Sequence, residues 1–169
     1  MKRYIVALLV ASLVSPALVV AQTGPDASQT AKASSSFDVI ADQALAVMKA
    51  KAQTMGIGGV AVVAYFEGDT IQAWSSKMIV VGRYKDLPTA TDKGSNLLAI
   101  AYAKASEMAD TLKDSGSGIR PPMTGEFGWN GGVIARGKTG YVIAAFSGGK
   151  SEDDAEISRE GLSKLKAKL

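Results

Sequence analysis

The chain has 169 residues, with 19 Lys and Arg against 16 Asp and Glu, and it contains neither His nor Cys. The absence of both excludes disulfide bonds, Ser-His and Cys-His nucleophilic machinery, and zinc sites built from His or Cys. Any haem iron would have to be ligated by Tyr, Met, Lys or an exogenous group. The formal net charge of +3 comes without a basic stripe interleaved with aromatic residues, which argues against nucleic acid as a partner.

Residues 1–21 have the pattern of a secretory signal peptide. Met1-Lys2-Arg3 is a basic start, an apolar run follows it, and the small residue Ala21 stands at its end. We expect cleavage after Ala21, which would give a periplasmic or secreted protein with no stable membrane span. The alternative is a retained membrane anchor, but the apolar run is short for a span and is interrupted by Pro16 and by serines.

Residues 22–36 are rich in Ser, Thr, Ala and Gln, and they predict a flexible leader. Ser35 or Ser36 is expected to cap a first helix that ends at Gly56 and Gly58. The apolar residues of that helix recur at spacings of three and four and mark one buried face: Phe37, Ile40, Ala44, Val47 and Met48. We assign residues 37–169 to one domain, an ordinary length for a single core.

Two runs of the chain, residues 59–66 and 141–146, are apolar at both alternating positions. This pattern predicts strands that are buried on both faces. The sequence Glu-Gly-Asp at 67–69 predicts a tight hairpin turn, and the more polar stretch 70–81 a returning strand near a sheet edge. Residues 129–135 are expected to form a hairpin with 141–146.

Two further helices complete the expected order of elements. The second is expected to begin at Thr91 or Ser95 and to reach Leu112. The third begins at Ser151, a good N-cap, and three acidic residues follow in its first turn. Short turns make neighbouring strands antiparallel, and strands buried on both sides need helices on both faces. The sequence therefore predicts an α/β (α+β) fold: a three-layer α/β/α sandwich around an antiparallel sheet.

The turn Ser147-Gly148-Gly149, just before the third helix, is the first candidate site. Exposed backbone N–H groups at a helix N-terminus attract a carboxylate or a phosphate. The alternative is plain capping, because Glu152, Asp153 and Asp154 already place negative charge there and would repel an added anion.

The loop between the second helix and the last hairpin is the second candidate. Arg120 offers a fork for a carboxylate, Pro121 stiffens the loop, and Glu126 and Trp129 follow. Trp129 offers a flat apolar face, so these residues could line a ligand cleft. The alternative is an ion pair between Arg120 and Glu126 with Trp129 in the core.

Four features resemble the haem-binding proteins of the HbpS-like and GlcG-like type. They are a helix ending in glycine before a Val-rich strand (56–63), a Lys104-Ala105 element, a glycine-rich hairpin entry (129–133), and the block from Ser147-Gly148-Gly149 through Asp153-Asp154 to Gly161-Leu162. The resemblance implies a profilin-like α/β/α fold, homo-oligomers, and binding of haem or another small molecule, in some members tied to haem breakdown or redox sensing. If haem binds, Arg120 is the candidate for a propionate and Tyr65 or Met78 for an axial ligand.

The leading hypothesis is an exported, non-catalytic small-molecule-binding protein, with haem as the first ligand to test. One alternative is an enzyme acting on a small carboxylate or on haem; carboxylates are present, but nothing in the sequence fixes their separation. Another alternative is an oligomeric structural or interaction module.

Overall fold

The computed structural model describes residues 27–167 and 169, so the predicted signal peptide (1–21) lies outside the described residues. The helices of this part are α1 (Ala27–Thr54), α2 (Leu97–Thr111) and α3 (Ser151–Lys166). The strands are β1 (Gly59–Glu67), β2 (Ser75–Val81), β3 (Lys85–Asp86), β4 (Ser95–Asn96), β5 (Gly132–Arg136) and β6 (Gly140–Ser147).

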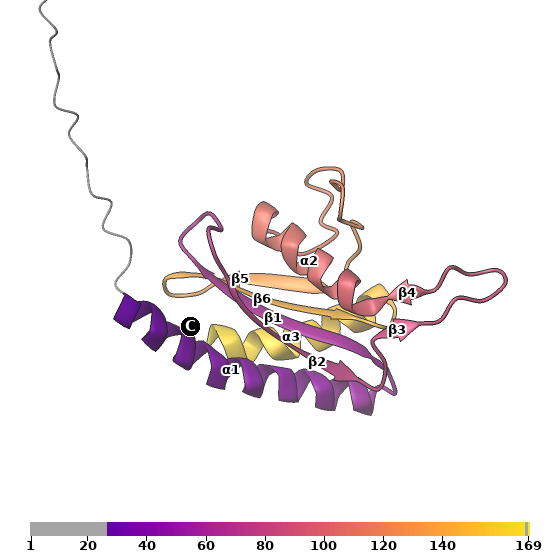
Figure 1. Ribbon diagram of the computed structural model, residues 1–169, viewed down its shortest axis with the longest axis horizontal. Coiled ribbons are helices and arrows are strands. Elements are labelled where there is room, and N and C mark those ends of the chain that lie inside the picture. Colours follow the sequence, from indigo (N-terminus) through magenta and orange to yellow (C-terminus); the bar gives the residue numbers. More distant parts are fainter. Residues whose placement is uncertain (1–26, 168) are drawn as a thin grey trace, which may run out of the picture.

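Four strands form one sheet in the order β2-β1-β6-β5, and every neighbouring pair is antiparallel. Helices α1 and α3 cover one face of this sheet and α2 covers the other, as Figure 1 shows. The predicted three-layer α/β/α sandwich is confirmed. The short strands β3 and β4 pair with each other and form a hairpin that projects from the end of the sandwich (Figure 1).

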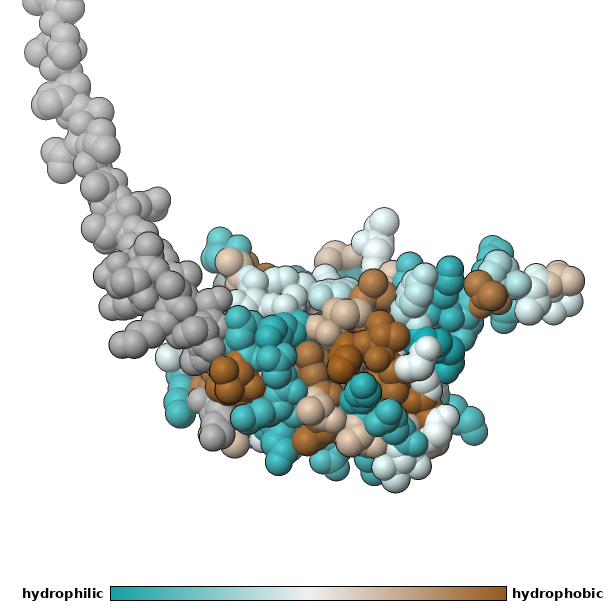
Figure 2. All heavy atoms as spheres, turned by 60° about the horizontal axis from the view of Figure 1, so that its bottom comes forward, coloured by the Kyte–Doolittle hydropathy of each residue, from teal (hydrophilic) through white to brown (hydrophobic). Residues whose placement is uncertain are grey.

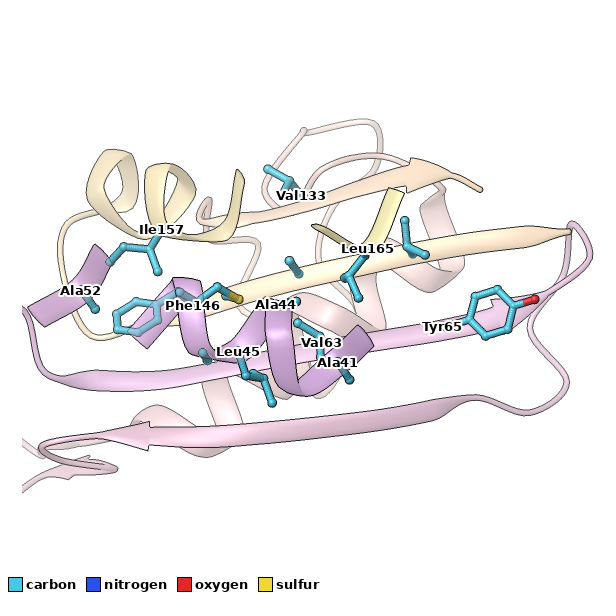
Figure 3. Packing of buried hydrophobic residues seen from close by; sticks show 14 of the residues in the cluster. Ala41, Ala44, Leu45, Ala52, Val63, Tyr65, Val133, Phe146, Ile157 and Leu165 are labelled. Atoms are coloured by element: carbon cyan, nitrogen blue, oxygen red, sulfur yellow. The ribbon is translucent and has the colours of Figure 1, made fainter. Parts of the chain in front are cut away.

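The two central strands are buried on both sides, as their uninterrupted apolar sequences predict. On β1, Val60 and Val62 pack toward α2, whereas Ala61 and Val63 pack toward α1 and α3, and all four are 0% exposed. Strand β6 alternates in the same way between the two layers. Figure 3 shows the layer under α1 and α3, where Phe146 lies beside apolar side chains of both helices. Helices on both faces are therefore required to keep these two strands out of water.

Helix α1 begins at Ala27, so the predicted start at Ser35 or Ser36 is wrong, and the predicted leader (22–36) overlaps the first turns of this helix. The stretch from residue 27 to 36 contains no Gly or Pro, and its Ala, Gln and Lys residues favour a helix that residues 37–54 continue, although its Ser and Thr residues favour it less. The predicted end is correct, because Gly56 follows the helix with a φ of +69°.

The connection from β1 to β2 is longer than predicted. Strand β2 begins only at Ser75, opposite Tyr65, so the tight turn expected at 67–69 is wrong. One reason is Trp74, whose ring lies 6.3 Å from that of Tyr102 on α2 and which packs on the core there instead of continuing the hairpin. The prediction that β2 lies at a sheet edge is correct.

Helix α2 is capped by Asn96, whose side-chain oxygen accepts a hydrogen bond of 3.0 Å from the backbone N–H of Ala99. The predicted caps, Thr91 and Ser95, are therefore wrong, because both lie before the cap and Ser95 belongs to strand β4. Placing the helix start directly after β4 fixes the β3–β4 hairpin beside the N-terminal end of α2.

The face that carries α1 shows apolar side chains gathered near its centre, among polar ones (Figure 2). Single large apolar side chains are also exposed, among them Val39 on α1 and Val80 on the edge strand β2. Within the residues that the structure describes, no helix has both the length and the apolar character that a membrane crossing requires.

Candidate ligand-binding site

The candidate site lies where β6 ends and the chain turns into α3. Gly148 allows a close approach there, because a Cβ on this residue would meet the carbonyl oxygen of Gly58 and would lie 2.7 Å from the Cα of Gly59. Arg83 holds the same two segments together by donating to the carbonyl oxygens of Gly58 (2.6 Å) and Gly148 (2.9 Å). The Ser147-Gly148-Gly149 turn is therefore fixed against the start of β1.

A buried ion pair joins this turn to the helices on both faces of the sheet. Lys104 of α2 and Asp154 of α3 are each 3% exposed, and their charged groups are 2.9 Å apart. The Lys104 ammonium also donates to the carbonyl oxygen of Phe146 at 2.7 Å. The Asp154 carboxylate accepts the backbone N–H of Gly149 at 2.8 Å. One cation and one anion thus tie α2, the end of β6 and the start of α3 to one another.

Burial acts on the protonation of both partners. It lowers the pKa of Lys104 below its ordinary value of 10.5, and the charge and hydrogen bond of Asp154 oppose this shift. Burial also raises the pKa of Asp154 above 3.8, which Lys104 and the N–H groups of Gly149 and Gly148 oppose. Buried ionisable groups with shifted pKa values are common at functional sites and also occur in structural ion-pair networks.

The Ser147-Gly148-Gly149 turn is capped by the protein itself. The cap position of α3 is Lys150, without a side-chain hydrogen bond, so the prediction that Ser151 is the N-cap is wrong. The carboxylate of Asp154 reaches back to Gly149 instead. The structure thus shows the capping alternative, in which an internal carboxylate occupies the place predicted for an external anion.

A cavity of about 170 Å³ opens beside the ion pair, and we call it the Lys104 pocket. It lies between α2, the start of α3, the β3–β4 hairpin and the long loop of residues 112–131. Its wall includes Lys104 and Asp154, all three residues of the Ser147-Gly148-Gly149 turn, and Trp129. The structure therefore brings together residues from both candidate regions of the sequence.

A larger cavity of about 290 Å³ lies next to it and shares Asn130 and Ser151 with the Lys104 pocket. Its wall carries the exposed Glu152 and Arg159 but contains neither member of the buried ion pair. We assign the candidate site to the smaller cavity, because convergent buried polar groups indicate a binding site better than volume does.

Arg120 and Glu126 form the ion pair that the sequence offered as the alternative to a ligand cleft. Arg120 donates to both carboxylate oxygens of Glu126 (2.7 and 2.8 Å), to Asp110 (2.6 and 3.1 Å) and to the carbonyl oxygen of Pro121 (3.1 Å). The hydrogen bonds from Arg120 lower the pKa of Glu126 to about 2. Arg120, Pro121 and Glu126 line neither cavity, so their contacts hold the long loop together.

Trp129 does not lie in the core, where the alternative interpretation of the loop placed it. Its side chain is 50% exposed, its ring lies 4.9 Å from that of Phe127, and it forms part of the wall of the Lys104 pocket. Trp129 also precedes β5, which begins at Gly132, so it is not part of the predicted strand 129–135. A half-exposed indole beside a cavity is available for contact with a ligand.

Tyr65 and Met78, the predicted haem ligands, lie on opposite faces of the sheet. Tyr65 packs in the layer under α1 and α3, and its hydroxyl is 2.6 Å from that of Thr139. Met78 packs in the layer under α2. Neither lines either cavity, and with Arg120 engaged by two carboxylates the three residues do not fit a single haem.

The sequence did not single out Lys104 as a candidate site residue, and named it only as part of the family resemblance. The signal was present, because a lysine at 104 interrupts the apolar face formed by Ala101, Ala105 and Met108. Its partner could not be found in the same way, since Asp154 lies 50 residues further along the chain. No protein-family model matches this chain, and a comparison with curated proteins finds no match, so the candidate site is argued from its geometry alone.

Proposed function

We propose that this chain is a non-catalytic small-molecule-binding protein whose ligand occupies the Lys104 pocket. The single observation that carries the proposal is the buried Lys104–Asp154 pair in the wall of a cavity that an exposed Trp129 borders. Taking two charges out of water is costly, and well-packed apolar residues often replace such a pair without loss of stability. Because Lys104 and Asp154 line a cavity, a role in shaping a ligand site explains the pair better than a contribution to stability does.

The hydrogen bonds favour binding over catalysis. One Asp154 carboxylate oxygen accepts from Gly149 and the other from Lys104, while Lys104 donates to both Asp154 and the carbonyl of Phe146. A general base or a nucleophile needs a free lone pair within reach of the substrate. Asp154 is 3% exposed and is already the partner of Lys104 and of the Gly149 N–H, so its carboxylate is held as an internal anion and is not presented to a substrate. The enzyme alternative also loses Arg120, its motivating residue, to Asp110 and Glu126.

Tryptophan fluorescence tests the proposal directly, because the chain has only two tryptophans. In the Trp74→Phe variant, Trp129 is the only reporter, and a panel of small metabolites should contain one that changes its emission saturably. In a Trp129→Phe variant the remaining tryptophan is Trp74, which packs beside Tyr102. The same compound should cause no saturable change in the fluorescence of that variant. If every compound that binds the protein leaves Trp129 silent, the proposal fails.

Haem is the ligand that the family resemblance implies, and it enters the same panel with the Soret band as its readout. The cavity of about 170 Å³ is below the range of about 300–1,000 Å³ typical of drug-sized ligands. We therefore expect no saturable Soret shift at micromolar haem, and a smaller compound as the ligand.

Export and homo-oligomerisation belong to the proposal as well. Export rests on the sequence of residues 1–21, and oligomerisation rests on the family resemblance together with exposed apolar side chains such as Leu87 and Phe127. Native mass spectrometry of the protein purified from its host measures both: we expect multiples of a chain that begins at Gln22. A full-length monomer would contradict both predictions.

A further inference from the structure

Ser147 carries a polar group that the fold leaves without a partner. The residue is 4% exposed, and its hydroxyl makes no hydrogen bond with any residue that the structure describes. Every described side-chain nitrogen or oxygen that is sealed off from solvent does have a partner. The Ser147 hydroxyl therefore keeps some contact with solvent, and the Lys104 pocket, which Ser147 lines, is the cavity through which it does so. A buried hydroxyl directed into a cavity indicates a hydrogen-bonding ligand there.

The charges around the pocket are already compensated inside the protein. Lys104 pairs with Asp154 at 2.9 Å, and Asp86, which also lines the pocket, pairs with Arg83 at 2.6 Å. The Gly149 N–H that could hold an anion is taken by Asp154. A charged ligand would lose its hydration and gain no opposite charge in return. The pocket therefore favours an uncharged ligand.

The remaining wall combines hydroxyl groups with an aromatic surface. Ser95 and Ser151 line the pocket together with Ser147, and Asn130 also belongs to its wall. A hydroxyl group both donates and accepts hydrogen bonds, so a row of them matches a ligand that carries hydroxyl groups itself. Trp129 supplies a flat apolar surface of the kind that packs against the C–H face of a sugar ring.

We propose that the ligand of the Lys104 pocket is a neutral polyhydroxylated ring, a monosaccharide or a close analogue. This inference rests on the proposed function, because it names the ligand class of the same site. Trp129 contacts the apolar face of the ring, and Ser147 exchanges hydrogen bonds with its hydroxyl groups. Lys104 has three N–H donors and the protein accepts two of them, which leaves one to donate to the ring.

The test uses sugars that differ in charge and little in shape, titrated into the full mature chain carrying Trp74→Phe. D-Xylose and D-glucose are the neutral probes, D-glucuronate is the anionic one and D-glucosamine the cationic one. We expect a neutral sugar to saturate the Trp129 signal with a Kd on the order of 1 mM or tighter, and each charged sugar to bind at least about tenfold more weakly. Adding Ser147→Ala should weaken binding by about threefold to tenfold through the loss of one hydrogen bond.

Ser163→Ala is the matched control, because Ser163 lies on the exposed side of α3, where its hydroxyl donates to the carbonyl of Glu160. It should leave the sugar affinity unchanged. Binding of glucuronate or glucosamine as tight as that of the neutral sugars overturns the inference, and so does binding that Ser147→Ala leaves intact. If no sugar binds but another compound saturates the Trp129 signal, the inference fails and the proposed function survives. If nothing affects Trp129, both fail.

Discussion

Replacing Lys104 with methionine should lower the free energy of unfolding by about 3–5 kcal/mol at neutral pH. Methionine fills a similar volume, so the cost comes from leaving the Asp154 carboxylate buried without its cation. Urea unfolding at pH 7 measures it. Lys164→Met, on the exposed side of α3, is the control and should change stability by less than about 0.5 kcal/mol. Equal and small effects of the two variants would show that the pair is not buried as described.

The double variant Lys104→Met/Asp154→Asn separates a stranded charge from lost packing. Asparagine is neutral and can still accept the N–H of Gly149. We therefore expect the double variant to be more stable than Lys104→Met alone, with a coupling of about 1–3 kcal/mol between the two sites. If the effects of the two single substitutions simply add, the side chains do not act as a pair.

The loss of stability in Lys104→Met should depend on pH. Burial raises the pKa of Asp154, and removing Lys104 removes a charge and a hydrogen bond that oppose the rise. The folded state then binds the proton more tightly than the unfolded state, whose pKa stays near 3.8. The resulting stabilisation is complete below that value and is lost as the pH rises through the folded-state pKa. The difference in free energy of unfolding between the variant and the parent protein should therefore become smaller as the pH falls from 7 to 4.

Gly131→Ala is the second substitution with a large expected effect. Gly131 has a φ of +122°, and a Cβ on it would lie 2.6 Å from both Asp154 Cβ and Lys104 Nζ. An alanine must adopt a strained backbone and must also push the ion pair apart, so we expect a loss of roughly 3 kcal/mol or more. The variant should also lose ligand-induced changes in Trp129 emission, because the wall of the Lys104 pocket moves.

Gly125→Ala is the matched control for this prediction. Gly125 also has a positive φ, of +96°, but a Cβ there would meet nothing within 4 Å. It carries the backbone strain without the collision and should cost about 1 kcal/mol. Thermal unfolding of the two variants side by side gives the comparison. Equal melting temperatures would mean that Gly131 is required for its backbone conformation and not for the space beside Lys104.

The layered fold could be predicted because the evidence for it is local. Strands β1 and β6 carry apolar residues at both alternating positions, and only a sheet covered on both faces can bury them. The helix caps were less predictable, because several polar residues near each start could serve. Asn96 caps α2, and not Thr91 or Ser95, because strand β4 ends at Asn96 and the helix begins directly after it. The position of β4 depends on tertiary structure.

The candidate site was only partly predictable, for the same physical reason. The Ser147-Gly148-Gly149 turn and Trp129 were visible as local patterns, and both line the pocket. The pairing of Lys104 with Asp154 connects two helices on opposite faces of the sheet, and no periodicity in the sequence encodes that contact. Arg120 was the most conspicuous residue of its loop. In the structure, however, its guanidinium pairs with the carboxylates of Asp110 and Glu126 and donates to the carbonyl oxygen of Pro121.

The most direct test is chemical-shift mapping of isotope-labelled protein spanning residues 22–169 with the compound that gives the strongest Trp129 response. We expect the largest changes on the backbone amides of Gly148 and Gly149 and on the indole N–H of Trp129, because these three residues line the Lys104 pocket. Changes that cluster instead around Arg120 and Glu126, or on the face covered by α1, would contradict the proposed site.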